Sequence, residues 1–392
     1  MHAIRAMQSS AGLVILAPDK FKGSLTAAEA AGRLAAGLRR AVPGIAVATV
    51  PVADGGEGTV DAVVAAAGFR RIRALVTGPT GRPVTASFAV RGETAVIESA
   101  QACGLWRLPD GKPAPLTATS FGVGELIAAA LDAGCTRIVL GLGGSACTDG
   151  GAGLVQALGA RLTDVDGTDV DGTGGAALAT ISTLDLTDLT IRLKGIDVTV
   201  ACDVDNPLLG ANGAAAVYGP QKGASPADVD LLDTALAAWS AAVAHAIDTD
   251  EYATYPGAGA AGGMGFAALA LLNARLRPGI DLMLELAGFA DRAAGSRLVI
   301  TGEGSLDAQS LRGKAPAGVA SAARALDVPV VAVSGICDLS PDQLHDAGFT
   351  AAYQLTDIED DVDRCIAHAG RLLELLAERI GRAHLMTNGA RP

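Results

Sequence analysis

The sequence predicts an α/β fold with two α/β domains. One domain is Rossmann- or flavodoxin-like, with a parallel sheet built from both chain ends, and the other is an inserted mixed α/β domain. Three observations predict this architecture. Strand-like and helix-like apolar runs alternate near both chain ends. Between these ends, part of the chain has the alternating pattern of antiparallel strands, and 392 residues are enough to form two hydrophobic cores. We expect a discontinuous domain at 1–69 plus 289–392 and an inserted domain, carrying the glycine-rich loops, at 70–288.

The N-terminal part predicts a β-α-β-α order. Residues 13–17 are continuously apolar, as in a parallel strand covered on both faces, and 45–50 resemble the next strand. Thr26 with Glu29 forms a capping-box pattern that predicts a helix to about residue 41, and a second helix is expected at 60–67.

The middle of the chain changes rhythm and then returns to the parallel pattern. Residues 84–90 and 94–99 alternate like an antiparallel hairpin. Thr119 and Ser120 are expected to cap a helix at 121–133. Further strands are predicted at 137–140, 198–202, 298–301, 328–334 and 351–355, and further helices at 226–247, from Phe266 onward and at 362–380.

Composition excludes several classes of partner. A formal charge of −12 argues against nucleic acid and against an anionic membrane surface. No apolar stretch approaches the ~20 residues that span a bilayer, and residues 1–10 lack the apolar core and cleavage site of a signal peptide. The six cysteines are scattered without metal-binding spacing, so we expect a reduced, cytoplasmic protein.

A glycine-rich loop at 139–153 is the first candidate site. An apolar run at 137–140 leads into a segment with six glycines within fifteen residues, and a helix-like alanine-rich run follows. A strand, glycine loop and helix in this order can bind an anion through backbone N–H groups, although a sharp turn is the plainer interpretation. The loop offers Gly143, Gly144, Ser145, Thr148 and Asp149.

Polar residues also follow the first two predicted strands. Asp19, Lys22 and Ser24 lie just past the first, where lysine charge and backbone N–H groups suit phosphate or carboxylate, although an ordinary β-α loop with solvated lysines explains this motif at least as well on its own. Asp54 and Glu57 follow the second, and a capping box explains them equally well.

Two later strands end in carboxylates as well. Asp203 and Asp205 are two apart on an extended chain and can share Mg²⁺, or supply a metal ligand and a base; an Asx turn before proline is the alternative. Glu303 and Asp307, with Lys314 beyond, repeat the pattern. Four acidic strand ends in one chain predict a cleft for metal and phosphate.

Two dinucleotide-like patterns are weak. The G-x-G-x-x-G match at 257–262 follows no buried strand. The G-x-G-x-x-A match at 141–146 follows a strand, but no helix opens at once. No P-loop or protein-kinase catalytic-loop pattern is present, so a phosphoryl-transfer enzyme would be of a less common type.

Eight motifs in order over about residues 13–380 make the chain resemble the bacterial type I glycerate kinases. They are A-P-D-K-F-K-G-S (17–24), A-D-G-G-E-G-T (53–59), T-x-T-S-x-G-x-G-E (117–125), G-G-S-A-x-x-D-G-G-A-G (143–153), A-C-D-V-D-N-P-L-x-G (201–210), G-P-Q-K-G-A (219–224), P-G-A-G-A-A-G-G-M-G (256–265) and T-G-E-G-x-x-D-x-Q (301–309).

The resemblance implies ATP- and Mg²⁺-dependent phosphorylation of glycerate, typically at the 2-hydroxyl to give 2-phosphoglycerate. One departure is Cys147-Thr148, where many members carry Thr-Asn. If that Asn contacts substrate or phosphate, Thr148 must do so through its hydroxyl.

Phosphoryl transfer needs in-line placement, charge neutralisation and an acceptor for the hydroxyl proton. We expect the 143–145 loop and the 257–263 loop, with Gly259, Gly262 and Gly263, to cradle phosphates. Lys22 is expected to neutralise charge, and either Asp149 or Asp203 to be the base. The expected metal ligands are Asp203, Asp205 and Glu303, and the expected further substrate or phosphate contacts are Asp19, Ser24, Thr148 and Lys314.

Two other functions stay open at this stage. One is a nicotinamide-dependent hydroxy-acid dehydrogenase using the 141–146 pattern, and the other is a non-catalytic anion-binding regulator. The expected partners are glycerate and ATP, with neither nucleic acid nor membrane, and the oligomeric state, a homo-oligomer included, stays open.

Overall fold

The computed structural model describes residues 12–52, 56, 58–170, 174–311 and 313–386. The segment considered for a signal peptide and the Asp54 and Glu57 pair therefore lie outside the described residues. The chain divides into two compact units. Unit 1 comprises Met1–Asp54, Ala65–Ala67 and Ile280–Pro392, and unit 2 comprises Gly55–Val64 and Gly68–Gly279. The predicted domain boundaries differ from these units at residues 55–64, 68–69 and 280–288. The domain boundaries remain a prediction.

Unit 1 is built on a five-stranded parallel sheet in the order β13-β12-β11-β1-β2. Its strands are β1 (Leu13–Pro18), β2 (Ala46–Thr49), β11 (Leu298–Leu306), β12 (Val330–Cys337) and β13 (Ala351–Gln354). Read from β2, this is the order 2-1-3-4-5 of a flavodoxin-like sheet. The central pair, β1 and β11, comes from opposite ends of the chain, as predicted.

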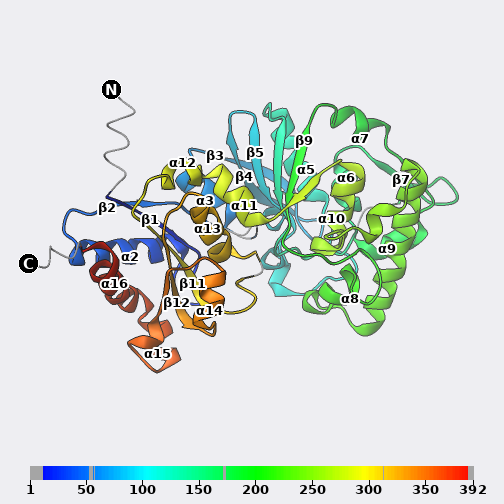
Figure 1. The fold of residues 1–392 in the computed structure, drawn as a ribbon. Coiled ribbons are helices and arrows are strands. Elements are labelled where there is room, and N and C mark those ends of the chain that lie inside the picture. The colour runs from blue at the N-terminus through cyan, green and yellow to red at the C-terminus, as the bar shows by residue number, and fades with distance from the viewer. Residues whose placement is uncertain (1–11, 53–55, 57, 171–173, 312, 387–392) are drawn as a thin grey trace, which may run out of the picture. The chain divides into compact units, whose positions relative to one another are not determined.

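Helices cover both faces of this sheet (Figure 1). One face packs on α2 (Ala27–Ala41) and α16 (Ala369–Ile380), through residues such as Leu34 and Leu373. The other face packs on α11 (Gly279–Leu286), α12 (Phe289–Ala293) and α13 (Ala315–Arg324), which contribute Ile280, Phe289 and Val319. The remaining helices of unit 1 are α14 (Pro341–Asp346), α15 (Val362–Ala367), the 3₁₀ turn η6 (Leu355–Asp357) and the π-helical η7 (Gly381–Leu385).

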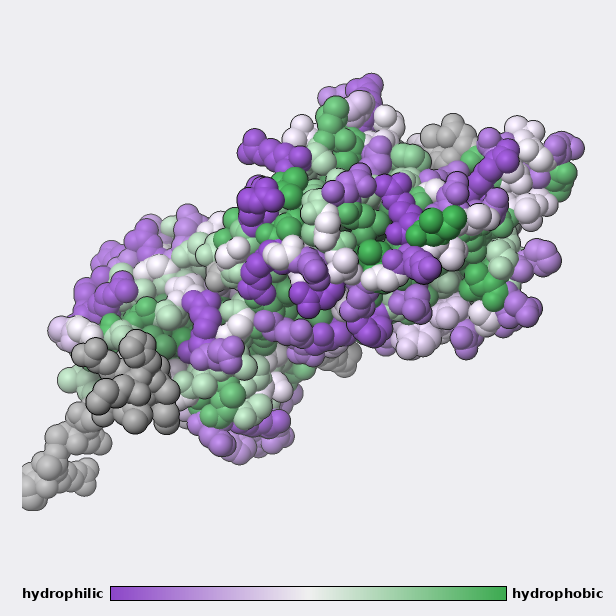
Figure 2. All heavy atoms as spheres, turned by 90° about the horizontal axis from the view of Figure 1, so that it is seen from above, coloured by the Kyte–Doolittle hydropathy of each residue, from purple (hydrophilic) through white to green (hydrophobic). Residues whose placement is uncertain are grey.

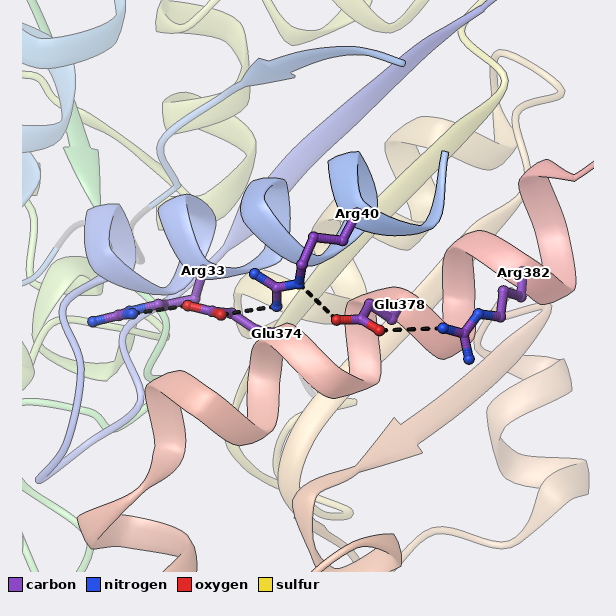
Figure 3. Close-up of polar contacts among 5 residues, drawn as sticks. All are labelled: Arg33, Arg40, Glu374, Glu378 and Arg382. Atoms are coloured by element: carbon purple, nitrogen blue, oxygen red, sulfur yellow. Dashed lines mark hydrogen bonds and ion pairs between the residues drawn. The ribbon is translucent and has the colours of Figure 1, made fainter. Parts of the chain in front are cut away.

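A row of ion pairs joins α2 to α16 along their exposed edges (Figure 3). Arg40 contacts both Glu374 and Glu378, at 2.8 and 2.7 Å, while Arg33 contacts Glu374 at 2.8 Å. Arg382 closes the row on Glu378. The first and last parts of the chain are thus held together by charge as well as by apolar packing.

Unit 2 contains a mixed six-stranded sheet in the order β10-β9-β6-β5-β4-β3. Its strands β5, β6, β9 and β10 are parallel, and β3, β4 and β5 form the predicted antiparallel part. The bounds are β3 (Arg70–Thr77), β4 (Pro83–Arg91), β5 (Thr94–Glu98), β6 (Arg137–Gly141), β9 (Asp197–Ala201) and β10 (Arg275–Arg277), with a separate pair β7 (Arg161–Thr163) and β8 (Thr183–Asp185).

One large apolar core lies among the helices of unit 2, without a residue from α3. These helices are α3 (Thr59–Ala66), α4 (Ala100–Cys103), α5 (Phe121–Asp132), α6 (Ala152–Ala157), α7 (Thr187–Arg192), α8 (Ala214–Tyr218), α9 (Pro226–Ile247) and α10 (Ala260–Leu271), with 3₁₀ turns at Leu105–Arg107, Pro109–Gly111, Gly175–Thr180, Pro220–Lys222 and Glu251–Thr254. Within the described part of the chain, no helix combines the length and apolarity that crossing a bilayer would need.

Two local predictions were wrong. The helix predicted over 362–380 is two helices, because His368, between α15 and α16, leaves the helical conformation. Of the predicted capping pair, the Ser120 hydroxyl makes no capping bond and donates to the carboxylate of Asp149 at 2.8 Å instead, whereas the Thr119 hydroxyl accepts from the backbone N–H of Phe121 at 3.2 Å. At Ser120 the tertiary contact with Asp149 outweighs the local pattern.

The face shown in Figure 2 is mostly hydrophilic, with hydrophobic side chains in small separate patches. A hydrophilic surface is consistent with the net charge of −12. Small-molecule sites are usually concave, so a cleft is the expected place for the site.

Candidate active site

A cleft of about 490 Å³ lies at the carboxyl ends of β1 and β11 in unit 1. In a 2-1-3-4-5 sheet the strand order reverses at this pair, and ligands of such folds bind there. One part of the lining is polar and another is apolar. The lining residues are Asp19, Lys20, Phe21, Lys22, Ser24, Glu303, Gly304, Ser305, Asp307, Lys314, Gly335, Ile336, Leu355, Val362, Cys365, Ile366 and Ala369.

A tight turn after β1 brings Lys22 to this cleft. Phe21 is buried and exchanges backbone hydrogen bonds with Leu25, which closes the turn. The Ser24 hydroxyl donates to the carbonyl of Phe21 at 3.1 Å. Lys22 is exposed at the turn, so its ammonium group is free to reach an anion in the cleft.

Glu303 is the half-buried carboxylate of the cleft. Burial raises its pKa above the ordinary value, while Ser310 and Lys314 oppose that shift. Its Oε1 atom is buried and has no hydrogen-bond partner among the described residues. Leaving such an atom unpaired is costly, so it is suited to receive a ligand group.

Asp307 and Lys314, which follow β11, differ from Glu303 in their surroundings. Asp307 accepts hydrogen bonds from the backbone of Gln309 and Ser310 at 2.8 and 3.0 Å, which lowers its pKa and fixes the turn. Lys314 is the residue before α13, so its charge lies beside the positive end of that helix. The structure thus brings Asp19, Lys22, Ser24, Glu303 and Lys314 together in one cleft.

In unit 2 the predicted glycine loop follows β6 and extends to α6. Gly143 and Gly144 are exposed, whereas Ser145, Thr148 and Asp149 are buried. Gly144 has a φ of +73°, which an L side chain rarely adopts. The two exposed glycines are therefore the part of the loop that can present backbone groups to a ligand.

A buried lysine supports this loop from behind. Lys222 is 3 % exposed, and its ammonium group donates to the carbonyl of Cys147 at 2.5 Å and to the Ser145 hydroxyl at 3.3 Å. Burial lowers the pKa of Lys222. Sequence reasoning missed this residue, although it belongs to the G-P-Q-K-G-A motif.

Asp149 anchors the loop rather than projecting from it. It is 1 % exposed, and one carboxylate oxygen accepts hydrogen bonds from the backbone and the hydroxyl of Ser120 at 2.7 and 2.8 Å. The other oxygen accepts from the backbone of Gly151 at 3.2 Å. This arrangement favours a positioning role over the predicted role as a base.

The second glycine-rich segment packs against the first. A Cβ on Gly262 would lie 2.1 Å from the carbonyl oxygen of Cys147, and one on Gly259 would lie 2.3 Å from that of Pro207. Gly263 is equally confined by Gly150. The N–H groups of Gly259 and Gly263 donate to backbone carbonyls. The geometry therefore favours close packing over the predicted phosphate cradle.

Asp203 and Asp205 lie exposed after β9, at the same sheet edge as the glycine loop. One oxygen of Asp203 accepts a hydrogen bond from the backbone of Gly279 at 2.8 Å. Within either unit, the described residues include no group of three or more His, Cys, Asp or Glu side chains arranged to hold a metal ion.

Glu98 is a second residue that sequence reasoning missed. It ends β5, beside Gly141 of β6, and accepts a hydrogen bond from the backbone of Val60 at the start of α3. Burial raises its pKa. The alternating pattern of 94–99 predicted a strand here but gave no signal that its last carboxylate is buried.

Of the two cysteines near the loops, Cys147 is buried and Cys202 is half-buried. Cys147 lies 3.7 Å from Cys103, sulfur to sulfur. The hydrogen bond to Cys103, together with burial, raises the pKa of the Cys147 thiol. A protonated thiol is a poor nucleophile, so Cys147 does not suit covalent catalysis.

Comparison with known proteins places these features in a family. The family model described as "Glycerate kinase family" matches residues 14–385. The chain is 44 % identical to "Glycerate kinase" of Bacillus subtilis over 369 residues, covering 94 % of this chain and 96 % of that protein. It is 45 % identical to "Glycerate 2-kinase" of Escherichia coli over 344 residues, covering 87 % and 90 %.

A solved structure agrees with the fold. The crystal structure described as "putative glycerate kinase 2 from Salmonella typhimurium LT2" matches with a TM-score of 0.81 and 41 % identity, covering 94 % of this chain and 97 % of that one. The similarity therefore extends over most of the chain. The chain belongs to the glycerate kinase family.

Proposed function

We propose that this protein is a glycerate kinase that transfers a phosphoryl group from ATP to the 2-hydroxyl of glycerate, with Mg²⁺, in the cytoplasm. Membership of the family supports the reaction, and the name of the Escherichia coli relative supports the 2-hydroxyl. The observation that carries the proposal is the unit 1 cleft, where Lys22, Ser24 and Lys314 meet the half-buried Glu303.

The cationic residues of this cleft suit phosphoryl transfer. Transfer places little covalent demand on the protein and depends on positioning and on neutralising the charge of the phosphoryl oxygens. Lys22, on a turn fixed by Phe21, supplies a mobile point charge. Lys314 adds a second charge beside the start of α13. Together these residues bind and orient the phosphate chain.

The oxygen ligands in the cleft fit Mg²⁺. Magnesium in kinases uses one or two carboxylates, with water and substrate phosphates completing its shell, so three protein carboxylates are not required. The unpaired, buried Oε1 of Glu303 is a carboxylate oxygen of this kind. When bound, the ion would offset phosphate charge. Asp203 and Asp205 remain the alternative ligands, in unit 2.

Of the two predicted bases, Asp203 is the better supported. A general base must lie within hydrogen-bond reach of the substrate hydroxyl. Asp149 is buried and its oxygens accept bonds from Ser120 and Gly151. Asp203 is exposed at a strand end. We therefore assign proton acceptance to Asp203 and loop positioning to Asp149.

The dehydrogenase alternative gains no support. In a dinucleotide fingerprint the helix opens directly after the glycines, so that its N-terminus meets the pyrophosphate. Here β6 ends at Gly141 and α6 begins only at Ala152. The loop between them is folded onto Lys222 and Asp149 instead.

The test is a coupled ATP-consumption assay with D-glycerate, followed by identification of the product as 2- or 3-phosphoglycerate. We expect Mg²⁺-dependent formation of 2-phosphoglycerate. We expect Lys22→Ala to abolish turnover with the fold intact, while the matched control Lys194→Ala, an exposed lysine in unit 2, keeps it. Glycerate-dependent nicotinamide reduction without ATP would instead identify a dehydrogenase, and binding without turnover a regulator.

A further inference from the structure

The unit 1 cleft is larger and more apolar than glycerate requires. A three-carbon acid fills roughly 100 Å³ at the packing density of organic solids. The cleft measures about 490 Å³, within the range of sites for larger ligands. A small, fully polar acid also has no apolar surface to offer to an apolar wall.

That apolar wall is formed by α15 and its neighbours. Val362 and Ile366 are four residues apart on α15 and line the cleft, although they are 44 % and 46 % exposed. Ile336, Leu355 and Ala369 extend the same wall. Large apolar side chains left exposed inside a concave site are typical of surfaces that a ligand covers.

The polar lining of the cleft carries three lysines, Lys20, Lys22 and Lys314, which match a phosphate chain, and three carboxylates, Asp19, Glu303 and Asp307, which match the Mg²⁺ that accompanies it. An apolar wall together with these lysines and carboxylates matches a ligand with a flat aromatic base at one end and metal-bound phosphates at the other. From this pairing we propose that unit 1 holds the nucleotide, with the base against Val362 and Ile366 and the phosphates at Lys22 and Lys314.

This inference rests on the proposed use of ATP and goes beyond it by assigning the nucleotide to unit 1 and its base to α15. The helix break at His368 separates α15 from α16 and allows α15 to line the cleft. α16 packs on α2, whereas α15, set apart by that break, is free to present Val362 and Ile366 to the cleft.

The test measures equilibrium binding of two probes by titration calorimetry: ADP, which has a base, and inorganic tripolyphosphate, which has none. The double variant Val362→Ser/Ile366→Ser should weaken ADP binding about tenfold and leave tripolyphosphate binding within about twofold. Lys314→Ala should weaken both. Ile191→Ser, an isoleucine 69 % exposed on α7 of unit 2, is the matched control and should change neither.

The inference is overturned if the double variant, with an unchanged melting curve, binds ADP like the wild type, or if only its KM for glycerate rises. Failure of the proposed function looks different. In that case the wild type forms no phosphoglycerate, yet the double variant still loses ADP affinity and keeps tripolyphosphate affinity.

Discussion

Lys222 is the residue whose burial has the clearest chemical consequence. Its ammonium group supports the loop that presents Gly143 and Gly144, through Cys147 and Ser145. Because burial lowers its pKa, the unfolded chain binds more protons than the folded chain between that lowered value and the ordinary value of about 10.4. The contribution of Lys222 to stability therefore rises with pH across this window.

We expect Lys222→Met to remove this rise. In urea unfolding between pH 7 and pH 10, the wild type should gain stability relative to the variant as the pH increases, and the variant should lose turnover. Lys194→Met, at an exposed lysine, should follow the wild type. Parallel pH profiles for wild type and Lys222→Met would contradict the assignment.

Thr148 occupies a position where many members of the family carry Asn, so its replacement tests whether this side chain contacts the substrate. The residue is fully buried, and its hydroxyl has no partner among the described residues. Replacement by the isosteric valine should then raise the free energy of unfolding by about 1 kcal/mol, since a buried unpaired hydroxyl is lost. The KM for glycerate should not change. A marked rise in that KM would show that the hydroxyl binds substrate.

At the residue scale, sequence patterns found the cleft but not its supports. Lys22, Ser24, Glu303 and Lys314 follow strands, and the carboxyl ends of parallel strands meet at one edge, so their convergence could be predicted. The burial of Lys222 and Glu98 could not, because burial of a charged side chain depends on distant segments that cover it. The same holds for Asp149, whose partner Ser120 lies 29 positions away, just before α5.

At the scale of elements, the ion pairs between α2 and α16 make the contact of these two helices depend on pH and salt. The hydrogen bonds to Arg33 and Arg40 lower the pKa of Glu374. A lowered pKa stabilises the fold above the ordinary value for glutamate and loses that effect as the pH falls through the lowered value. Ion pairs this exposed are also screened by salt.

We therefore expect Arg40→Ala to lower the melting temperature slightly at neutral pH and low salt. The difference from wild type should disappear in about 1 M salt, and again at acid pH where Glu374 is protonated. Thermal melts followed by circular dichroism measure this. Arg39→Ala, at an exposed arginine that forms no ion pair with any described residue, serves as the control. A salt-independent loss would indicate packing by the Arg40 stem instead.

Elements with strong local signals were predicted well, and those shaped by their neighbours were not. The capping box at Thr26 and Glu29 is present, and α9 has the predicted bounds. The strands β7, β8 and β10 have three residues each, too short for a periodic signal. The break at His368 left the apolar periodicity intact, so one helix was predicted where two exist.

For the whole molecule, separate cores predict separate unfolding. The core of unit 2 forms one cluster, and the two faces of the unit 1 sheet form two others, which share that sheet. Calorimetry should resolve two transitions, of which ADP raises only the one assigned to unit 1. The Lys22→Ala variant identifies the unit 1 transition, because it should reduce the rise in melting temperature that ADP causes there. A rise confined to the unit 2 transition would contradict the nucleotide assignment.

The fold class was predictable because alternating apolar runs at both ends imply a shared parallel sheet. The strand order was not, since five parallel strands can be arranged in several ways with the same local patterns. The pairing of β1 with β11 follows from contacts between distant parts of the chain, such as Thr301 with Ala17.

This pairing has a consequence for synthesis on the ribosome. The hydroxyl of Thr301 donates to the carbonyl of Ala17 across 284 positions of sequence. At a translation rate of 5–20 residues per second, the nascent β1 waits roughly 15–60 s before its central partner emerges. Unit 2, almost continuous in sequence, can fold during that time. The emerging apolar strand Leu13–Pro18 is then the segment that a chaperone would need to shield.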